Sequence, residues 1–116
     1  MRITDLLDKQ SISLNGAPKD KKEALDQVVD LMAKSGKIND VEAYRQRVYA
    51  REEESTTGIG EGIAIPHGKC DAVTKPGLAA MVVKDGVDFD SLDGEPVHLI
   101  FLLQLRTQKI ISIWTY

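Results

Sequence analysis

The segment Ser55–Lys69, STTGIGEGIAIPHGK, constrains the fold most, because four glycines and one proline fall within fifteen residues. Glycine weakens a regular helix, while proline fixes its own φ and lacks a backbone N–H donor. A helix therefore cannot continue through this part of the chain. We predict a loop, a short strand at Ile63–Ile65 and a second loop.

Two helices are predicted before this segment. The first spans about Lys19–Ser35 and ends at Gly36, which can take a left-handed conformation. The second begins at Asn39, an N-cap candidate with Glu42 three residues on, and ends near residues 51–53. Apolar residues recur at helical spacing in the first, which predicts one packed face: Leu25, Val28, Val29 and Met32.

Strands are predicted after the glycine-rich segment, at Leu78–Val83 and Val97–Leu103. The second is a nearly continuous apolar run, typical of a strand that is covered on both faces. Asp85-Gly86 and Asp93-Gly94 are turn signals. Two helices followed by covered strands predict an α/β sandwich, and 116 residues predict a single domain.

Composition excludes several classes of protein. The chain has 15 Lys and Arg against 18 Asp and Glu, a net charge of −3, which disfavours a general nucleic-acid binder. Its single cysteine, Cys70, cannot form an internal disulfide and fits a reducing compartment. No secretory signal is visible, and the apolar run Leu99–Leu103 is too short to span a membrane. We therefore expect a cytoplasmic protein.

His67 is the first candidate for chemistry. A strand ending in Pro66 would present His67 at a rigid exit, beside Gly68, where a phosphate could approach the backbone closely. A neutral imidazole is nucleophilic near neutral pH and can carry a transferred group covalently. The alternative is a histidine that makes only a structural hydrogen bond in a turn.

Arg51, sixteen residues before His67, is the second candidate. A guanidinium can bind phosphoryl oxygens with two hydrogen bonds. The alternative is that the arginine only stabilises the helix, because its positive charge lies near the negative C-terminal end of the helix dipole. Ser55, Thr56 and Thr57 could supply hydroxyl and backbone N–H donors to a phosphate. His98, at the start of the apolar strand, is expected to be structural.

Other chemistry is not supported. The glycine spacing matches neither the dinucleotide-binding nor the P-loop motif. His67 and Cys70 form an HxxC pair, but two ligands without further Cys or His neighbours do not build a zinc site. We expect Cys70 to be inert.

Residues 1–103 resemble the enzyme IIA domain of the fructose/mannitol class of the bacterial phosphoenolpyruvate:sugar phosphotransferase system. Three stretches carry the resemblance: ITDLLDK (3–9), AREEESTTGIGEGIAIPHGK (50–69) and FDSLDGEPVHLIFLL (89–103). The amino-acid sequences of these stretches are most similar to the fructose-specific branch, and nitrogen-regulatory relatives share IAIPHGK. The resemblance implies a mixed β-sheet flanked by helices on both faces.

The resemblance also implies a function. The histidine matching His67 accepts a phosphoryl group from the histidine-containing phosphocarrier protein and passes it to a cysteine of the IIB domain. That domain phosphorylates the sugar carried inward by the membrane IIC domain. Arg51 matches an arginine that assists at the phosphoryl group, and neither metal nor organic cofactor is implied. The alternative is a nitrogen-regulatory module that controls partner proteins.

The resemblance ends at Leu103, so we divide the chain into an incomplete IIA domain, 1–103, and an atypical tail, 104–116. Family members continue with a second active-site histidine and further helices, whereas this chain has no histidine after His98. We expect the absence of this second histidine and of these helices to lower the rate of phosphoryl transfer and the stability of the fold. An inactive remnant is a further alternative. The apolar IISIWTY of the tail leads us to expect self-association.

Overall fold

A computed structural model of the protein describes residues 7–36, 38–69 and 77–105. They form one six-stranded sheet in the order β1-β5-β6-β3-β2, with β4 also paired to β6. β5 and β6 are antiparallel, whereas β1 pairs with β5 and both β3 and β4 pair with β6 in parallel. The strands are β1 Leu7–Gly16, β2 Gly58–Gly60, β3 Ile63–Ala64, β4 His67–Lys69, β5 Gly77–Val87 and β6 Val97–Leu105.

The two predicted helices are present as α2, Lys21–Ala33, and α3, Val41–Glu54. Each begins two residues after the expected start, directly after an aspartate. The Asp20 side chain accepts from the backbone N–H of Glu23, and Asp40 caps α3 in the same way, so Asp40 replaces the predicted N-cap Asn39. Gly36 follows α2 at φ 74°, which confirms the predicted stop.

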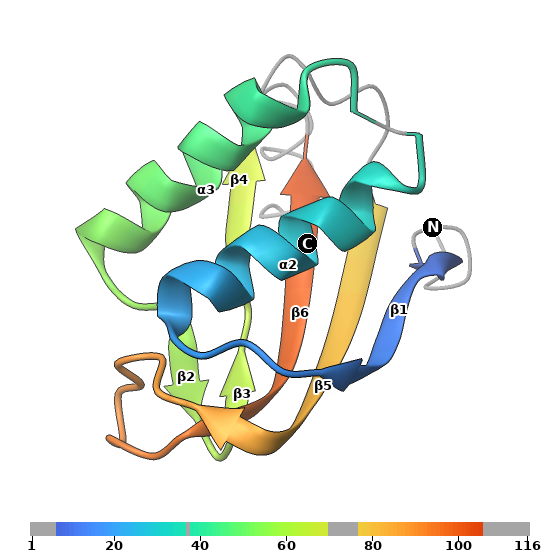
Figure 1. Ribbon diagram of the computed structural model, residues 1–116. Helices are drawn as coiled ribbons and strands as arrows, with labels where there is room; N and C mark the ends of the chain where they lie inside the picture. The colour runs from blue at the N-terminus through green and yellow to red at the C-terminus, as the bar shows by residue number, and fades with distance from the viewer. Residues whose placement is uncertain (1–6, 37, 70–76, 106–116) are drawn as a thin grey trace, which may run out of the picture.

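Both helices lie on one side of the sheet, in front of it in Figure 1. There α2 packs against alternate residues of β5 and β6, such as Met81 and Ile100, which are register partners, and α3 packs against β4. Between these residues, Val82 and Leu99 face the other side and are only half-buried. The mixed α/β sheet is thus confirmed, but a helical layer on the second face is not found among residues 7–36, 38–69 and 77–105. The buried residues of the helices are Ala24, Leu25, Val28, Val29, Met32, Tyr44, Val48 and Glu52.

Sequence patterns missed β1. Its sequence, LDKQSISLNG, is largely polar because β1 lies at one end of the strand order and pairs only with β5. Leu14 is 68% exposed, so the alternation of the strand does not stand out as a buried pattern. The glycine-rich segment likewise forms three short strands where we expected one.

β6 extends to Leu105, two residues beyond the predicted end of the domain. Gln104 is in register with Gly77 of β5 and Gly68 of β4, and Leu105 with Lys69. The first two residues of the predicted tail therefore belong to the sheet. The remainder of the tail, and with it the expected self-association, lies outside the described residues, as does Cys70.

The turn between β2 and β3 is held by Asp93, in the loop between β5 and β6. Its carboxylate accepts the backbone N–H of Glu61 at 2.9 Å and that of Glu95 at 3.0 Å. Glu61 itself has φ 57°, a conformation uncommon outside glycine. Hydrogen bonds to Glu61 and Glu95 lower the pKa of Asp93.

This lowered pKa predicts a pH-dependent loss of stability. The ionised carboxylate stabilises the fold above its unfolded pKa of about 3.9, and the contribution is lost as the pH falls through the lower folded value. Asp93→Asn should lower the unfolding temperature at pH 7, and the difference from the parent chain should shrink at pH 3. Asp85→Asn, at an exposed aspartate, is the control. A difference that is equal at both pH values would contradict the expectation.

Candidate functional site

His67 is the first residue of β4 and follows a break in the strand that pairs with β6. β3 pairs with β6 through Ala64 and Ile100, and β4 resumes with His67 opposite Leu103. Between them, the carbonyl of Pro66 accepts the backbone N–H of Leu103 at 3.1 Å, although proline has no N–H to donate. His67 therefore follows a proline break, as expected, but it starts a new strand where we predicted a loop.

The His67 imidazole is oriented by one hydrogen bond. Its Nδ1 lies 3.2 Å from the carbonyl oxygen of Ile65, which can only accept, so Nδ1 is the protonated nitrogen. In the neutral ring the lone pair then lies on Nε2. The structural hydrogen bond that we considered as an alternative role is present, and it does not involve Nε2.

Gly68 lies in close contact with α3. A Cβ at this position would lie 3.0 Å from Cγ2 of Val48 and 3.3 Å from Cε1 of Tyr44, both on α3. The absence of a side chain at Gly68 thus lets β4 lie close to α3, and the expected approach of a phosphate to its backbone stays a prediction. Because neighbouring residues of a strand face opposite sides, His67 points away from these contacts.

Arg51 and His67 line one cavity of about 240 Å³. Arg51 lies in the last turn of α3, and its Nη1 donates to the carbonyl oxygen of Ser55 at 2.9 Å, just beyond the helix. That hydrogen bond satisfies a backbone carbonyl at the end of the helix and also holds the guanidinium at the cavity wall. The lining residues are Arg51, Thr56, Thr57, Ile59, Ile65, His67 and Leu103.

Thr56 and Thr57 also line the cavity, but their hydroxyl protons are used within the protein. Thr56 Oγ1 donates to the carbonyl oxygen of Phe89 at 2.9 Å and accepts from Gly58 N at 3.1 Å. Thr57 Oγ1 donates to Glu52 at 2.6 Å. In this arrangement the two side chains hold the loop in place, and the expected contact of Thr56 and Thr57 with a phosphate stays a prediction.

Glu52 is the residue that sequence patterns did not single out. It is 8% exposed, and its carboxylate accepts from both the backbone N–H and the hydroxyl of Thr57. Lys21 Nζ lies 2.8 Å from its Oε2. The spacing of Tyr44, Val48 and Glu52, four residues apart on the buried stripe of α3, is the signal that would have found it.

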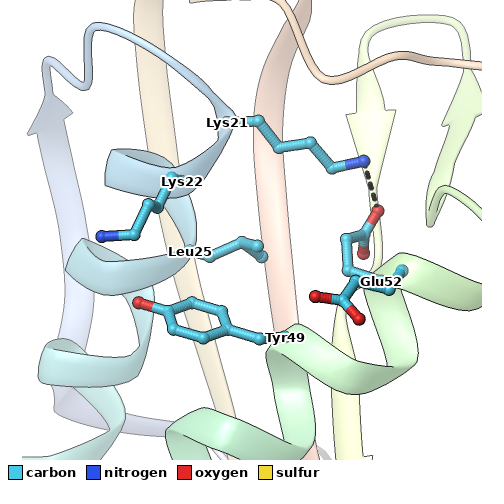
Figure 2. A pocket seen from close by; sticks show the side chains of 6 residues that line it. Lys21, Lys22, Leu25, Tyr49 and Glu52 are labelled. Carbon is cyan, nitrogen blue, oxygen red and sulfur yellow. Dashed lines mark ion pairs between the residues drawn. The ribbon is translucent and has the colours of Figure 1, made fainter.

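A second hollow, of about 400 Å³, lies between α2 and α3. Figure 2 shows Leu25 and Tyr49 between the two helices and Lys21 reaching across to Glu52. The last turn of α3 thus separates two hollows, with Arg51 lining the first and Glu52 the second.

Within the described residues, no group of three or more His, Cys, Asp or Glu side chains is placed to hold a metal ion. In the same part of the chain, no helix has the length and apolar character needed to cross a membrane.

Comparison with known proteins identifies the family. The sequence model of the phosphoenolpyruvate-dependent sugar phosphotransferase system, EIIA 2, matches residues 5–111. The class of protein that this fold and this sequence model define is therefore a IIA component of that phosphotransferase system. The chain belongs to the EIIA 2 family.

Among curated proteins, the chain is similar to fructose-specific components. It is 50% identical over 103 residues to the fructose-specific EIIABC component of Bacillus subtilis, covering 89% of this chain and 16% of that protein. It is 39% identical over 101 residues to the fructose-specific EIIA component of Haloferax volcanii, covering 87% of this chain and 66% of that protein. The chain thus spans less than two thirds of either relative.

Solved structures share the fold. Nitrogen regulatory protein IIA-Ntr from Neisseria meningitidis matches with a TM-score of 0.85 and 28% identity, over 97% of this chain and 79% of that one. Enzyme IIA mannitol of Escherichia coli, in complex with phosphorylated enzyme IIB mannitol, matches with a TM-score of 0.79 and 27% identity, over 95% and 78%. These similarities confirm the expected fold class and family.

Proposed function

We propose that this chain is a phosphocarrier for fructose-type sugar uptake. His67 accepts a phosphoryl group from the histidine-containing phosphocarrier protein and passes it to a cysteine of a IIB domain, which serves a membrane IIC domain. The observation that carries the proposal is the Nδ1 hydrogen bond of His67, which leaves Nε2 free in a cavity shared with Arg51.

Transfer at His67 needs no acid or base beyond the imidazole. The Nε2 lone pair forms the new P–N bond while the P–N bond of the donor phosphohistidine breaks, and the donor nitrogen keeps that electron pair. The proton stays on Nδ1, which donates it in a hydrogen bond to the carbonyl oxygen of Ile65. Arg51 neutralises charge on the phosphoryl oxygens, and a IIB thiolate then attacks the same phosphorus, which returns the electron pair to Nε2.

The similar proteins support these partners. The Bacillus subtilis relative is an EIIABC component, and the Escherichia coli mannitol protein is seen with phosphorylated enzyme IIB. By analogy we place this chain in the cytoplasm, without a metal or organic cofactor and without a nucleic-acid partner.

The similarity to IIA-Ntr favours a second candidate, a nitrogen-regulatory module whose phosphorylation controls partner proteins. The two candidates differ in the next acceptor. A sugar-system carrier passes its phosphoryl group to a IIB cysteine, whereas a regulatory module keeps it in the presence of the same IIB domain.

The experiment is mass spectrometry of the chain after incubation with phosphoenolpyruvate, enzyme I and the phosphocarrier protein. We expect a mass increase of one phosphate, labile in acid and stable in base as for a phosphohistidine, and its loss when a fructose-type IIB domain is added. Omission of enzyme I is the control. An unmodified chain would favour the inactive remnant, and a label retained with IIB would favour the regulatory module.

A further inference from the structure

We infer that Glu52, paired with Lys21, is a positioning residue for phosphoryl transfer at His67. The inference rests on the proposed function and names a residue that acts on the cavity from outside it. Glu52 does not line the cavity that Arg51 and His67 share. It contacts instead the loop that forms one wall of that cavity.

The Glu52 carboxylate holds this loop by two hydrogen bonds. Oε2 accepts the backbone N–H of Thr57 at 2.9 Å, and Oε1 accepts the Thr57 hydroxyl at 2.6 Å. Thr57 is 4% exposed, so loss of these acceptors would leave two buried donors without partners. The loop between α3 and β2 is therefore tied back onto the last turn of α3.

Lys21 compensates the buried charge and ties α2 to the same loop. Its Nζ lies 2.8 Å from Glu52 Oε2 and 3.5 Å from Thr56 Oγ1, and 4.9 Å from the centre of the Phe89 ring. Phe89 in turn accepts the Thr56 hydroxyl through its carbonyl. Figure 2 shows the ion pair spanning the space between the two helices. Because a buried carboxylate is costly without a partner, the pair acts as a unit.

This network reaches the reacting groups through Arg51. Arg51 precedes Glu52 in the chain, and its guanidinium is held by Ser55, two residues before Thr57. A loop released at Thr57 would move Ser55, and with it the donor fork that faces the phosphoryl group. Because transfer depends on alignment, a shift of about 1 Å can cost a large factor in rate.

The test compares Glu52→Gln with Glu53→Gln, its exposed neighbour on α3. Glutamine keeps the size and one acceptor oxygen but removes the charge that pairs with Lys21. We expect Glu52→Gln to slow phosphorylation of His67 by roughly tenfold at saturating donor, with the half-saturating donor concentration within about twofold, as expected for lost alignment. Glu53→Gln should match the parent chain.

Lys21 supplies a second, independent pair of variants. Lys21→Met should slow transfer as Glu52→Gln does, and Lys21→Arg, which keeps the charge beside Glu52, should restore most of the rate. Thermal unfolding of each variant shows whether the chain is folded at the assay temperature. If Glu52→Gln does not fold, the Lys21 pair decides the question.

NMR of the unphosphorylated chain separates this inference from the proposed function. Glu52→Gln should shift the Thr57 amide, the Arg51 Nε–H and the His67 imidazole resonances, whereas Glu53→Gln should leave them in place. These shifts are expected even if the parent chain proves inactive, in which case they alone decide the inference. Unmoved Arg51 and His67 resonances, or a folded Glu52→Gln that transfers at the parent rate, would overturn it.

Discussion

His67→Gln should abolish phosphorylation of the chain. A glutamine side chain has a similar reach, but its amide nitrogen is not nucleophilic, so no P–N bond can form. Mass spectrometry after incubation with phosphoenolpyruvate, enzyme I and the phosphocarrier protein should show only the unmodified mass, while the parent chain gains one phosphate.

His98→Gln is the matched control, because it removes the other of the two histidines. His98 lies five residues before Leu103 on β6, about 17 Å from the His67 register position at a rise of ~3.4 Å per residue. Its Nδ1 is 3.1 Å from the carbonyl oxygen of Val83, a structural contact. A label that persists in His67→Gln, or that is found on His98, would refute the assignment.

Arg51→Lys should slow phosphoryl transfer by roughly a hundredfold, because lysine keeps the charge but loses the planar fork that binds two oxygens at once. The unfolding temperature should change little, since Arg51 is half-buried and its described contact is to Ser55. Rapid-quench kinetics of His67 phosphorylation, alongside thermal unfolding, measures both effects.

Arg47→Lys makes the same chemical change one turn earlier on α3, at a position that does not line the cavity. This variant should transfer at the parent rate. The expectation for Arg51 fails if Arg51→Lys is as fast as Arg47→Lys. The expectation also fails if the transfer rate of Arg51→Lys falls only in proportion to the fraction of that variant that is folded.

Local sequence patterns determined the helices, the strands β5 and β6, and the proline break. Helical spacing alone places four apolar residues on one stripe: Leu25, Val28, Val29 and Met32. Gly36 ends that helix through its own φ. Pro66 likewise interrupts pairing by its own chemistry, which places His67 just after the break. These are properties of neighbouring residues, so they can be read along the chain.

The tertiary structure decided what each of these residues meets. Gly68 makes room for Val48 of α3, and the Thr57 hydroxyl donates to Glu52, and neither contact follows from the local sequence. β1 became visible only through its pairing with β5, because a polar edge strand has little pattern of its own. The link from Lys21 through Glu52 to the cavity joins residues 31 or more positions apart, whose approach depends on how α2 and α3 pack on one face of the sheet.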